Sequence, residues 1–501
     1  MKKIVKNIIE TQNDNNIAIT SINNPPLYYK DLKLLINNIS RQLSGNEISN
    51  KSRAAIVLPN GPHMATSFLA ISSYMSAAPL NLNYKAEEFE FYLEDLKPKL
   101  VLVDPNSNNA VVGVAKKLKI PVCEIKIKND APSGMFDLFI KNNDYNLPNE
   151  DDEALVLHTS GTTSRPKIVP LTNKNVFSSS KNISLSLELT EKDHCLNIMP
   201  LFHIHGLIAV LASSMKVGAS VCATNGFNAL KFLDLAKSEK ISWYSGVPTM
   251  HQAILMRVDK NLELAKNLNL RFLRSSSASL PPAVFEKLNS AFDCPVIEAY
   301  GMTEATHQMT SNPLPPKKQK AGFVGIPSGP EVCIMNEDDK ILNQGREGEV
   351  CIKGNNVTLG YENNPEANKS SFSNGWFRTG DQGYFDKDGY LKISGRLKEI
   401  INKGGEKISP LEIDNVLMNH PAIEQAVCFG YNDKMLGEDI ATAIIVKEGK
   451  KCSEDDIKNY SKEKLAKFKI PKKIFFVNEI PKGATGKLQR NVLAKSFGLN
   501  N

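Results

Sequence analysis

The sequence predicts an α/β protein large enough for more than one domain. Its 501 residues, 41% of them hydrophobic, can bury several layers of secondary structure. Short apolar runs typical of buried strands alternate with stretches whose apolar residues recur at helical spacing, and this alternation is typical of parallel sheets covered by helices. Beyond residue 320, short segments separated by glycines favour a small barrel-like β subdomain.

The first strand and helix patterns lie within the first hundred or so residues. Residues 54–58 form an apolar strand-like run, and Pro62 opens a helix, since proline is favoured in a first helical turn. Apolar residues then recur at helical spacing over 89–96, before the next strand-like run at 100–103. Later strand-like runs lie at 154–157, 219–223, 241–245, 271–274, 296–299, 427–430, 441–446 and 474–477, and later helix-like stretches at 173–187, 207–215, 411–418 and 455–468.

Composition and charge are those of an ordinary globular protein of a reducing compartment. The net charge of +7 comes from 61 basic and 54 acidic residues that are scattered along the chain, so it suits anionic substrates without implying nucleic acid. The eight cysteines form no C-x-x-C pair. No segment approaches a membrane span, and Lys6 and Glu10 interrupt the apolar stretch near the N-terminus. We therefore expect a cytoplasmic protein without nucleic-acid or membrane partners. Its oligomeric state stays open between a monomer and a homodimer.

Residues 158–167, HTSGTTSRPK, have the composition of a phosphate-binding loop. Hydroxyls and backbone N–H groups can converge on an anion in such a loop, Lys167 can neutralise charge, and the N-terminus of the helix expected at 173–187 can add its positive dipole end. The spacing G-x-x-x-x-G-K-[ST] is absent, so this is not a Walker loop. The stretch predicts an anionic, phosphate-bearing ligand.

The run TSGTTSRPK resembles the phosphate loop of the adenylate-forming enzymes, the superfamily of acyl-CoA synthetases, luciferases and peptide-synthetase adenylation domains. FHIHGL, YGMTE, WFRTGD and GATGKLQR follow in the order of that superfamily. His158 with the Ser-Arg pair of the loop, and the runs FHIHGL, RSSSAS and MTEATHQM, resemble the oxalate–CoA ligase branch. Ile168 departs from the pattern, in which a glycine usually follows the lysine.

The resemblance implies a nucleotide site that binds ATP with Mg2+. Tyr300 and Gly301 would cover the adenine, the hydroxyl of Thr303 would reach a phosphate oxygen, and Glu304 would hold Mg2+. Asp381 and Arg396 match the residues that contact the ribose. The residues expected around the phosphates are Thr159, Ser160, Gly161, Thr162, Thr163 and Lys167.

The resemblance places the acid beside four polar residues. His203 would lie at the reacting carboxylate, and His205, Ser277 and His307 would donate to a second carboxylate, because a site for oxalate needs donors where other branches have apolar walls. Two alternatives stay open. The spacing of His203 and His205 also suits zinc, although no thiolate or carboxylate cluster is near in sequence, and each histidine could be a core imidazole bonded to a backbone carbonyl.

The resemblance also implies two domains, with boundaries at 1–397 and 398–501. The first would hold two parallel-type α/β sheets and the β-barrel-like subdomain, and the second would be a mobile α/β lid that turns about Lys398. Gly404 and Gly405 would approach the pantetheine arm of coenzyme A, and Lys487 would be catalytic. The implied activity is ligation of a small acid, oxalate first, to CoA through an acyl-adenylate. A synthetase for another short or aryl acid, or an inactive nucleotide-binding regulator, remains as an alternative.

Overall fold

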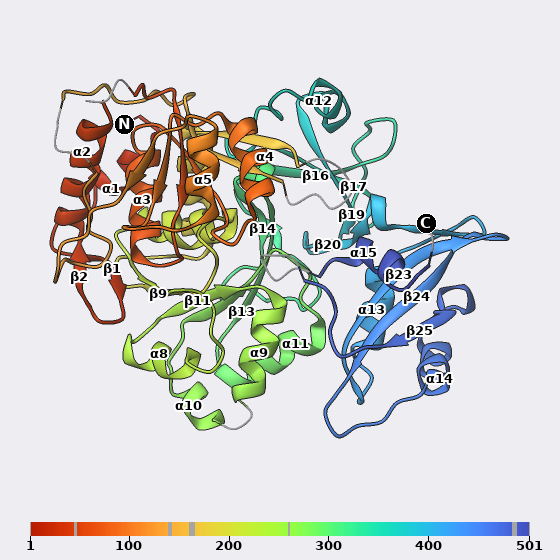
Figure 1. Cartoon of the computed structure of the whole chain (residues 1–501). Helices are drawn as coiled ribbons and strands as arrows, with labels where there is room; N and C mark the ends of the chain where they lie inside the picture. Colours follow the sequence, from red (N-terminus) through yellow and green to blue (C-terminus); the bar gives the residue numbers. More distant parts are fainter. Residues whose placement is uncertain are drawn as a thin grey trace.

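The computed structural model describes residues 2–44, 48–138, 143–159, 166–258, 261–482 and 488–499. These residues form four β-sheets with helices on their faces, which confirms the predicted α/β class (Figure 1). Among the helices of these ranges, a candidate for spanning a bilayer is absent.

A six-stranded sheet contains the first strands that the sequence predicts. Five of its strands are parallel, and β8 adds an antiparallel strand at one edge. Two helices, α4 (Ala86–Leu96) and α5 (Ala110–Lys117), pack on its outer face through residues such as Phe89 and Val111. The strand order is β6 (Val122–Glu124), β5 (Leu100–Val103), β3 (Arg53–Val57), β4 (Ser76–Pro79), β7 (Glu153–His158) and β8 (Ile168–Thr172).

A nine-stranded sheet carries most of the later strands. It is parallel from β13 to β1, with antiparallel strands at both edges. Its outer face is covered by α8 (Phe232–Ser238), α9 (Pro248–Val258), α10 (Leu262–Lys266) and α11 (Pro282–Phe292). The strand order is β15 (Ile326–Pro327), β14 (His307–Ser311), β13 (Val296–Met302), β12 (Phe272–Ser275), β11 (Trp243–Gly246), β9 (His194–Asn197), β10 (Ser220–Ala223), β1 (Ile17–Ser21) and β2 (Asn24–Tyr28).

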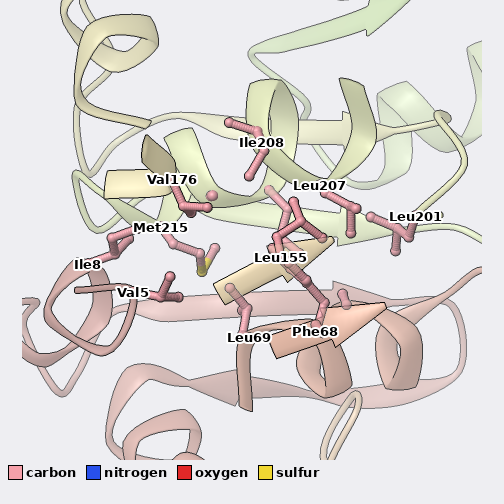
Figure 2. Packing of buried hydrophobic residues seen from close by; sticks show 14 of the residues in the cluster. Val5, Ile8, Phe68, Leu69, Leu155, Val176, Leu201, Leu207, Ile208 and Met215 are labelled. Atoms are coloured by element: carbon pink, nitrogen blue, oxygen red, sulfur yellow. The ribbon is translucent and has the colours of Figure 1, made fainter. Parts of the chain in front are cut away.

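The main hydrophobic core lies between these two sheets. Figure 2 shows Leu155 of β7 and Phe68 facing Val176, Leu207 and Ile208 across this layer. The apolar stretch predicted as a helix at 207–215 forms a π-helix and then a short α-helix. The helices of the layer are α1 (Lys6–Glu10), α2 (Tyr29–Ser44), α3 (Pro62–Ser72), α6 (Asn173–Ser186), η1 (His205–Ala212) and α7 (Ser213–Met215).

The β subdomain expected beyond residue 320 is a five-stranded antiparallel sheet. The middle of its long strand β19 lies next to β13 of the nine-stranded sheet, since Tyr300 bonds Asp381. The strands are β16 (Glu331–Met335), β17 (Gly348–Lys353), β18 (Phe372–Ser373), β19 (Trp376–Phe385) and β20 (Leu391–Arg396), with α12 (Pro365–Ser371) preceding β18.

A second five-stranded sheet follows η3 (Leu397–Glu399) and forms the C-terminal part, drawn in blue in Figure 1. Helices pack on both of its faces: Ile413 and Ile457 belong to one apolar cluster, and Leu493 belongs to the other. Ser453 caps α14 in a capping box with Asp456. The elements are β21 (Ile401–Lys403), β22 (Glu406–Ile408), α13 (Pro410–Leu417), β23 (Ile423–Asp433), β24 (Gly437–Val446), α14 (Glu454–Lys464), η4 (Lys467–Lys469), β25 (Lys473–Phe476) and α15 (Arg490–Ser496).

Candidate active site

The predicted phosphate loop joins the two strands of a β-hairpin, β7 and β8. The backbone N–H of Thr159 donates to the carbonyl of Lys167 at 2.9 Å, and the N–H of Lys167 donates to Oγ1 of Thr159 at 3.1 Å. The two ends of the loop are therefore held side by side. Four residues predicted to hold phosphate, Ser160, Gly161, Thr162 and Thr163, lie outside the described residues.

The prediction that a helix N-terminus adds its positive dipole end to this loop is wrong. Strand β8 separates Lys167 from α6, which begins at the far end of the hairpin, where the N–H of Asn173 bonds the carbonyl of Asp152 at 2.9 Å. The side chain of Thr172 caps that helix by accepting from the N–H of Asn175. The positive end of α6 is thus about a strand length away from the loop.

Ile168, the departure from the superfamily pattern, fits its position. It is the first residue of β8, pairs with His158, and is 4% exposed within the apolar cluster on the outer face of the six-stranded sheet. Its backbone is extended strand, so the position does not require the conformations that favour glycine.

Replacing Ile168 with glycine is expected to lower stability without raising activity. The substitution removes a buried side chain and weakens a strand, which together cost about 2–5 kcal/mol. Thermal unfolding and pyrophosphate release would be measured together. A glycine variant that is more active than the parent would show instead that Ile168 restrains the loop.

Tyr361 contacts both Lys167 and Glu304. The Lys167 ammonium is 4.3 Å from the centre of the Tyr361 ring, and the Tyr361 hydroxyl donates to Oε1 of Glu304 at 2.7 Å. Burial lowers the pKa of Lys167, the carboxylate of Glu304 opposes that shift, and Lys398 adds to it. Tyr361 was not predicted, because a single tyrosine in the polar run LGYENNPE carries no signal of its own.

Glu304 has the environment that a magnesium ligand needs. It is 6% exposed in η2 (Thr303–Ala305), directly after the partly exposed Thr303. The described residues hold no cluster of three or more metal-ligating side chains, which gives the zinc alternative at His203 no support. One carboxylate suits Mg2+, which is usually held by one or two carboxylates together with substrate phosphates.

The two predicted ribose residues form a network with the predicted adenine residue. Nε of Arg396 donates to Oδ1 of Asp381 at 2.8 Å, and the hydroxyl of Tyr300 donates to Oδ2 at 2.5 Å. Burial and the neighbouring carboxylate raise the pKa of Tyr300, while the charge of Asp381 raises the pKa of Arg396. Three strands, β13, β19 and β20, therefore converge on one buried carboxylate.

Gly301 is required by the close approach of two strands. A Cβ at this position would lie 1.9 Å from the carbonyl oxygen of His307, where β13 and β14 meet. His307 itself has φ of 93°, and Ser277 has φ of 72°, both in the left-handed region that costs non-glycine residues energy. Such strain is often found at ligand sites.

The structure brings together the three residues predicted to bind a second carboxylate. His205 is fully buried at the start of η1, and its Nδ1 lies 2.9 Å from Oγ of Ser277. The rings of His205 and His307 lie 4.9 Å apart between centroids. His205 is therefore partnered by side chains, Ser277 and Ser245, in contrast to the alternative of a core imidazole bonded to a backbone carbonyl.

His203 lies in the turn before η1 and is partly exposed. Its Nδ1 accepts a hydrogen bond from the N–H of His205 at 3.2 Å, and its own N–H donates to the carbonyl of Pro200. The stretch is a turn that leads into a helix, so the two histidines do not share one face of an extended strand.

The predicted hinge and CoA residues lie at the start of the C-terminal part. Lys398 is the middle residue of η3, between β20 and β21. Gly404 and Gly405 form the tip of the β21–β22 hairpin with φ of 59° and 92°, and the N–H of Gly404 donates to the carbonyl of Leu436. Lys487 lies outside the described residues.

Known proteins resemble the chain in sequence and in structure. An oxalate–CoA ligase of Arabidopsis thaliana is 48% identical, over 91% of this chain and 91% of its own. An oxalate–CoA ligase of Saccharomyces cerevisiae is 40% identical, over 97% and 95%. The crystal structure of ATP-bound MatB from Rhodopseudomonas palustris superposes with a TM-score of 0.89 at 27% identity, covering 99% of both chains.

A further structural relative is the o-succinylbenzoate CoA synthetase MenE from Bacillus subtilis in complex with its acyl-adenylate. It superposes with a TM-score of 0.83 at 28% identity over 98% of both chains. Residues 10–362 match the AMP-binding enzyme family, and residues 412–487 match its C-terminal domain. The chain therefore belongs to the family of AMP-binding enzymes.

Proposed function

We propose that this protein ligates oxalate to coenzyme A at the expense of ATP, releasing AMP and pyrophosphate. One observation carries the choice of acid: the buried His205 and His307 and the partly exposed Ser277 form a polar cluster. A second carboxylate beside the reacting one must be taken out of water, so it needs hydrogen-bond donors in the protein. The two relatives named oxalate–CoA ligase support the same acid.

In the first half-reaction, a carboxylate oxygen attacks the α-phosphate of ATP and pyrophosphate leaves. Lys167 and the loop before it bind the phosphates, Thr303 donates to one of their oxygens, and Lys487 stabilises the reacting carboxylate and phosphate. Mg2+ bound at Glu304 supplies charge neutralisation there. The catalysis consists of positioning and electrostatic stabilisation, as is usual for phosphoryl chemistry.

The nucleoside is held by the Asp381 network. The carboxylate of Asp381 accepts hydrogen bonds from the ribose hydroxyls, Arg396 contacts the ribose, and Tyr300 and Gly301 lie along the adenine. His203 orients the reacting carboxylate of the acid, and His205, Ser277 and His307 bind the other one. Thr159, Ser160, Gly161, Thr162 and Thr163 surround the phosphates.

In the second half-reaction, the thiol of CoA attacks the carbonyl of the acyl-adenylate. The lid, residues 398–501, turns about Lys398 relative to residues 1–397, so that Lys487 withdraws and Gly404 and Gly405 border the pantetheine arm. Support comes from the position of Lys398 in the short η3 that joins two sheets. We also propose a cytoplasmic location and a monomeric or homodimeric state. The eight free thiols support a reducing compartment such as the cytoplasm.

The decisive experiment is pyrophosphate release by the purified protein with ATP and Mg2+, with and without CoA. The acids compared would be oxalate, malonate, acetate, coumarate and a medium-chain fatty acid. Turnover that depends on CoA and is confined to oxalate is the expected result. Turnover with another acid would keep the ligase mechanism and refute the choice of acid, whereas silence with every acid would favour the regulatory alternative.

A further inference from the structure

The core beside the acid-binding cluster contains a buried arginine with no carboxylate partner. Arg274 lies on β12 and is 0% exposed, and no carboxylate in the described ranges lies within ion-pair distance of its guanidinium. Its Nε has no hydrogen-bond partner there. Burial lowers the pKa of Arg274 to about 9. An unpaired buried cation is costly, so its presence calls for an explanation.

Arg274 contacts one residue of the cluster directly and bonds the chain neighbour of another. Its Nη1 lies 3.4 Å from Nε2 of His205, and its Nη2 donates to Oε1 of Gln308 at 3.1 Å. Gln308 follows His307 directly on β14, and Ser277 follows Arg274 by three residues. One side chain thus joins β12, β14 and η1 immediately behind the cluster.

The hydrogen bonds around His205 have one consistent direction. A guanidinium can only donate hydrogen bonds, so Nε2 of His205 is the acceptor. Its donor is either Nη1 of Arg274 or the hydroxyl of Ser245, which lies 2.7 Å from Nε2. The Ser245 hydroxyl in turn lies 3.3 Å from Nη1. The ring proton of a neutral His205 is then on Nδ1, which donates to Oγ of Ser277 at 2.9 Å. The hydroxyl proton of Ser277 is left to donate to a ligand.

We infer that Arg274 is a positioning and specificity-determining residue for the non-reacting carboxylate of the acid. Its charge compensates the second negative charge of the acid, and its hydrogen bonds orient His205 so that Nδ1 donates to Ser277 and the Ser277 hydroxyl donates to the acid. The residue acts through His205 and does not touch the substrate. The inference rests on the proposed function, because it supposes that the acid carries a second anionic group.

The test compares oxalate with oxamate, in which an uncharged amide replaces the second carboxylate. Arg274→Met keeps the volume and removes the charge. We expect it to raise the KM for oxalate about 10- to 100-fold, with little change in the KM for oxamate or ATP. Its melting temperature should be unchanged or higher, because an apolar residue replaces an unpaired buried charge. Arg274→Lys should restore part of the preference for oxalate.

A matched control is Arg271→Met, on an arginine three residues earlier that pairs with Asp193. It should leave the ratio of oxalate to oxamate unchanged. The inference would be overturned if Arg274→Met lost activity equally with oxalate and oxamate. A fall in its melting temperature with an unchanged ratio of oxalate to oxamate activity would overturn it as well. In both cases, oxalate turnover by the parent protein would keep the proposed function.

Failure of the proposed function is recognised separately. If the parent protein turns over no acid, the shift of its melting temperature on adding oxalate still tests Arg274. A shift in the parent that is lost in Arg274→Met supports the inference, and the absence of a shift in the parent, or an equal shift in both, refutes it. A parent protein that prefers oxamate to oxalate refutes it as well.

Discussion

Glu304→Gln is expected to slow pyrophosphate release about 100- to 1000-fold, the range found when a catalytic electrostatic group is removed. Glutamine has the same shape, and its amide oxygen can still accept the hydrogen bond from Tyr361, so the local fold should persist. The lost charge is the one that opposes the lowering of the pKa of Lys167. Initial rates over a series of Mg2+ concentrations would show both the fall in rate and a higher Mg2+ requirement.

Tyr361→Phe is the matched control for this experiment. It removes the 2.7 Å hydrogen bond to Glu304 but keeps the carboxylate and the aromatic ring below Lys167. Loss of one such bond should cost about 1–2 kcal/mol, which corresponds to a change of roughly 5- to 30-fold. If Glu304→Gln were no worse than Tyr361→Phe, with an unchanged Mg2+ requirement, the proposed metal role of Glu304 would be wrong.

Lys398→Pro is expected to stop thioester formation while adenylate formation continues. Proline fixes φ near about −65° and restricts the preceding residue, so it removes the change in backbone angle that a turning lid needs. Lys398 lies in the three-residue η3 between β20 and β21. The proposed turn of the lid therefore requires a change in few dihedral angles. ATP–pyrophosphate exchange reports the first half-reaction, and CoA-dependent release of AMP reports the second.

Lys398→Ala separates the backbone effect from the loss of charge. It removes the ammonium that helps to lower the pKa of Lys167 but leaves the backbone free to turn. We expect this variant to carry out both half-reactions. A parallel loss of exchange and AMP release in Lys398→Pro would argue that residue 398 is not a hinge.

The sequence predicted many of the strands and helices from their apolar patterns but not others, such as α2, α9 and α11. It missed β8 for a physical reason. Pro170 cannot donate to a ladder, which argues against a strand in the middle of a sheet. β8 lies at the edge of the six-stranded sheet, where Pro170 pairs with Val156 and a missing N–H is tolerated. The same omission produced the mistaken helix dipole at the phosphate loop.

Some residues of the candidate site could be predicted from the sequence and others could not. Glu304 and Asp381 could be predicted because each lies in a local motif, and the structure places each of them beside other predicted residues. Tyr361 and Arg274 could not, because their importance depends on contacts with Glu304 and His205, which are distant in sequence. An apolar run likewise cannot distinguish the π-helix that begins at His205 from an α-helix.

The paired oxygens of Asp381 have a consequence for the end of each catalytic cycle. Oδ1 and Oδ2 each accept one hydrogen bond from the protein, from Arg396 and Tyr300, and a carboxylate oxygen can accept about two. In the proposed role, a ribose hydroxyl therefore adds to each oxygen without displacing a protein donor. When AMP departs, the buried charge still has its partners, so product exit requires no compensating rearrangement at this corner of the site.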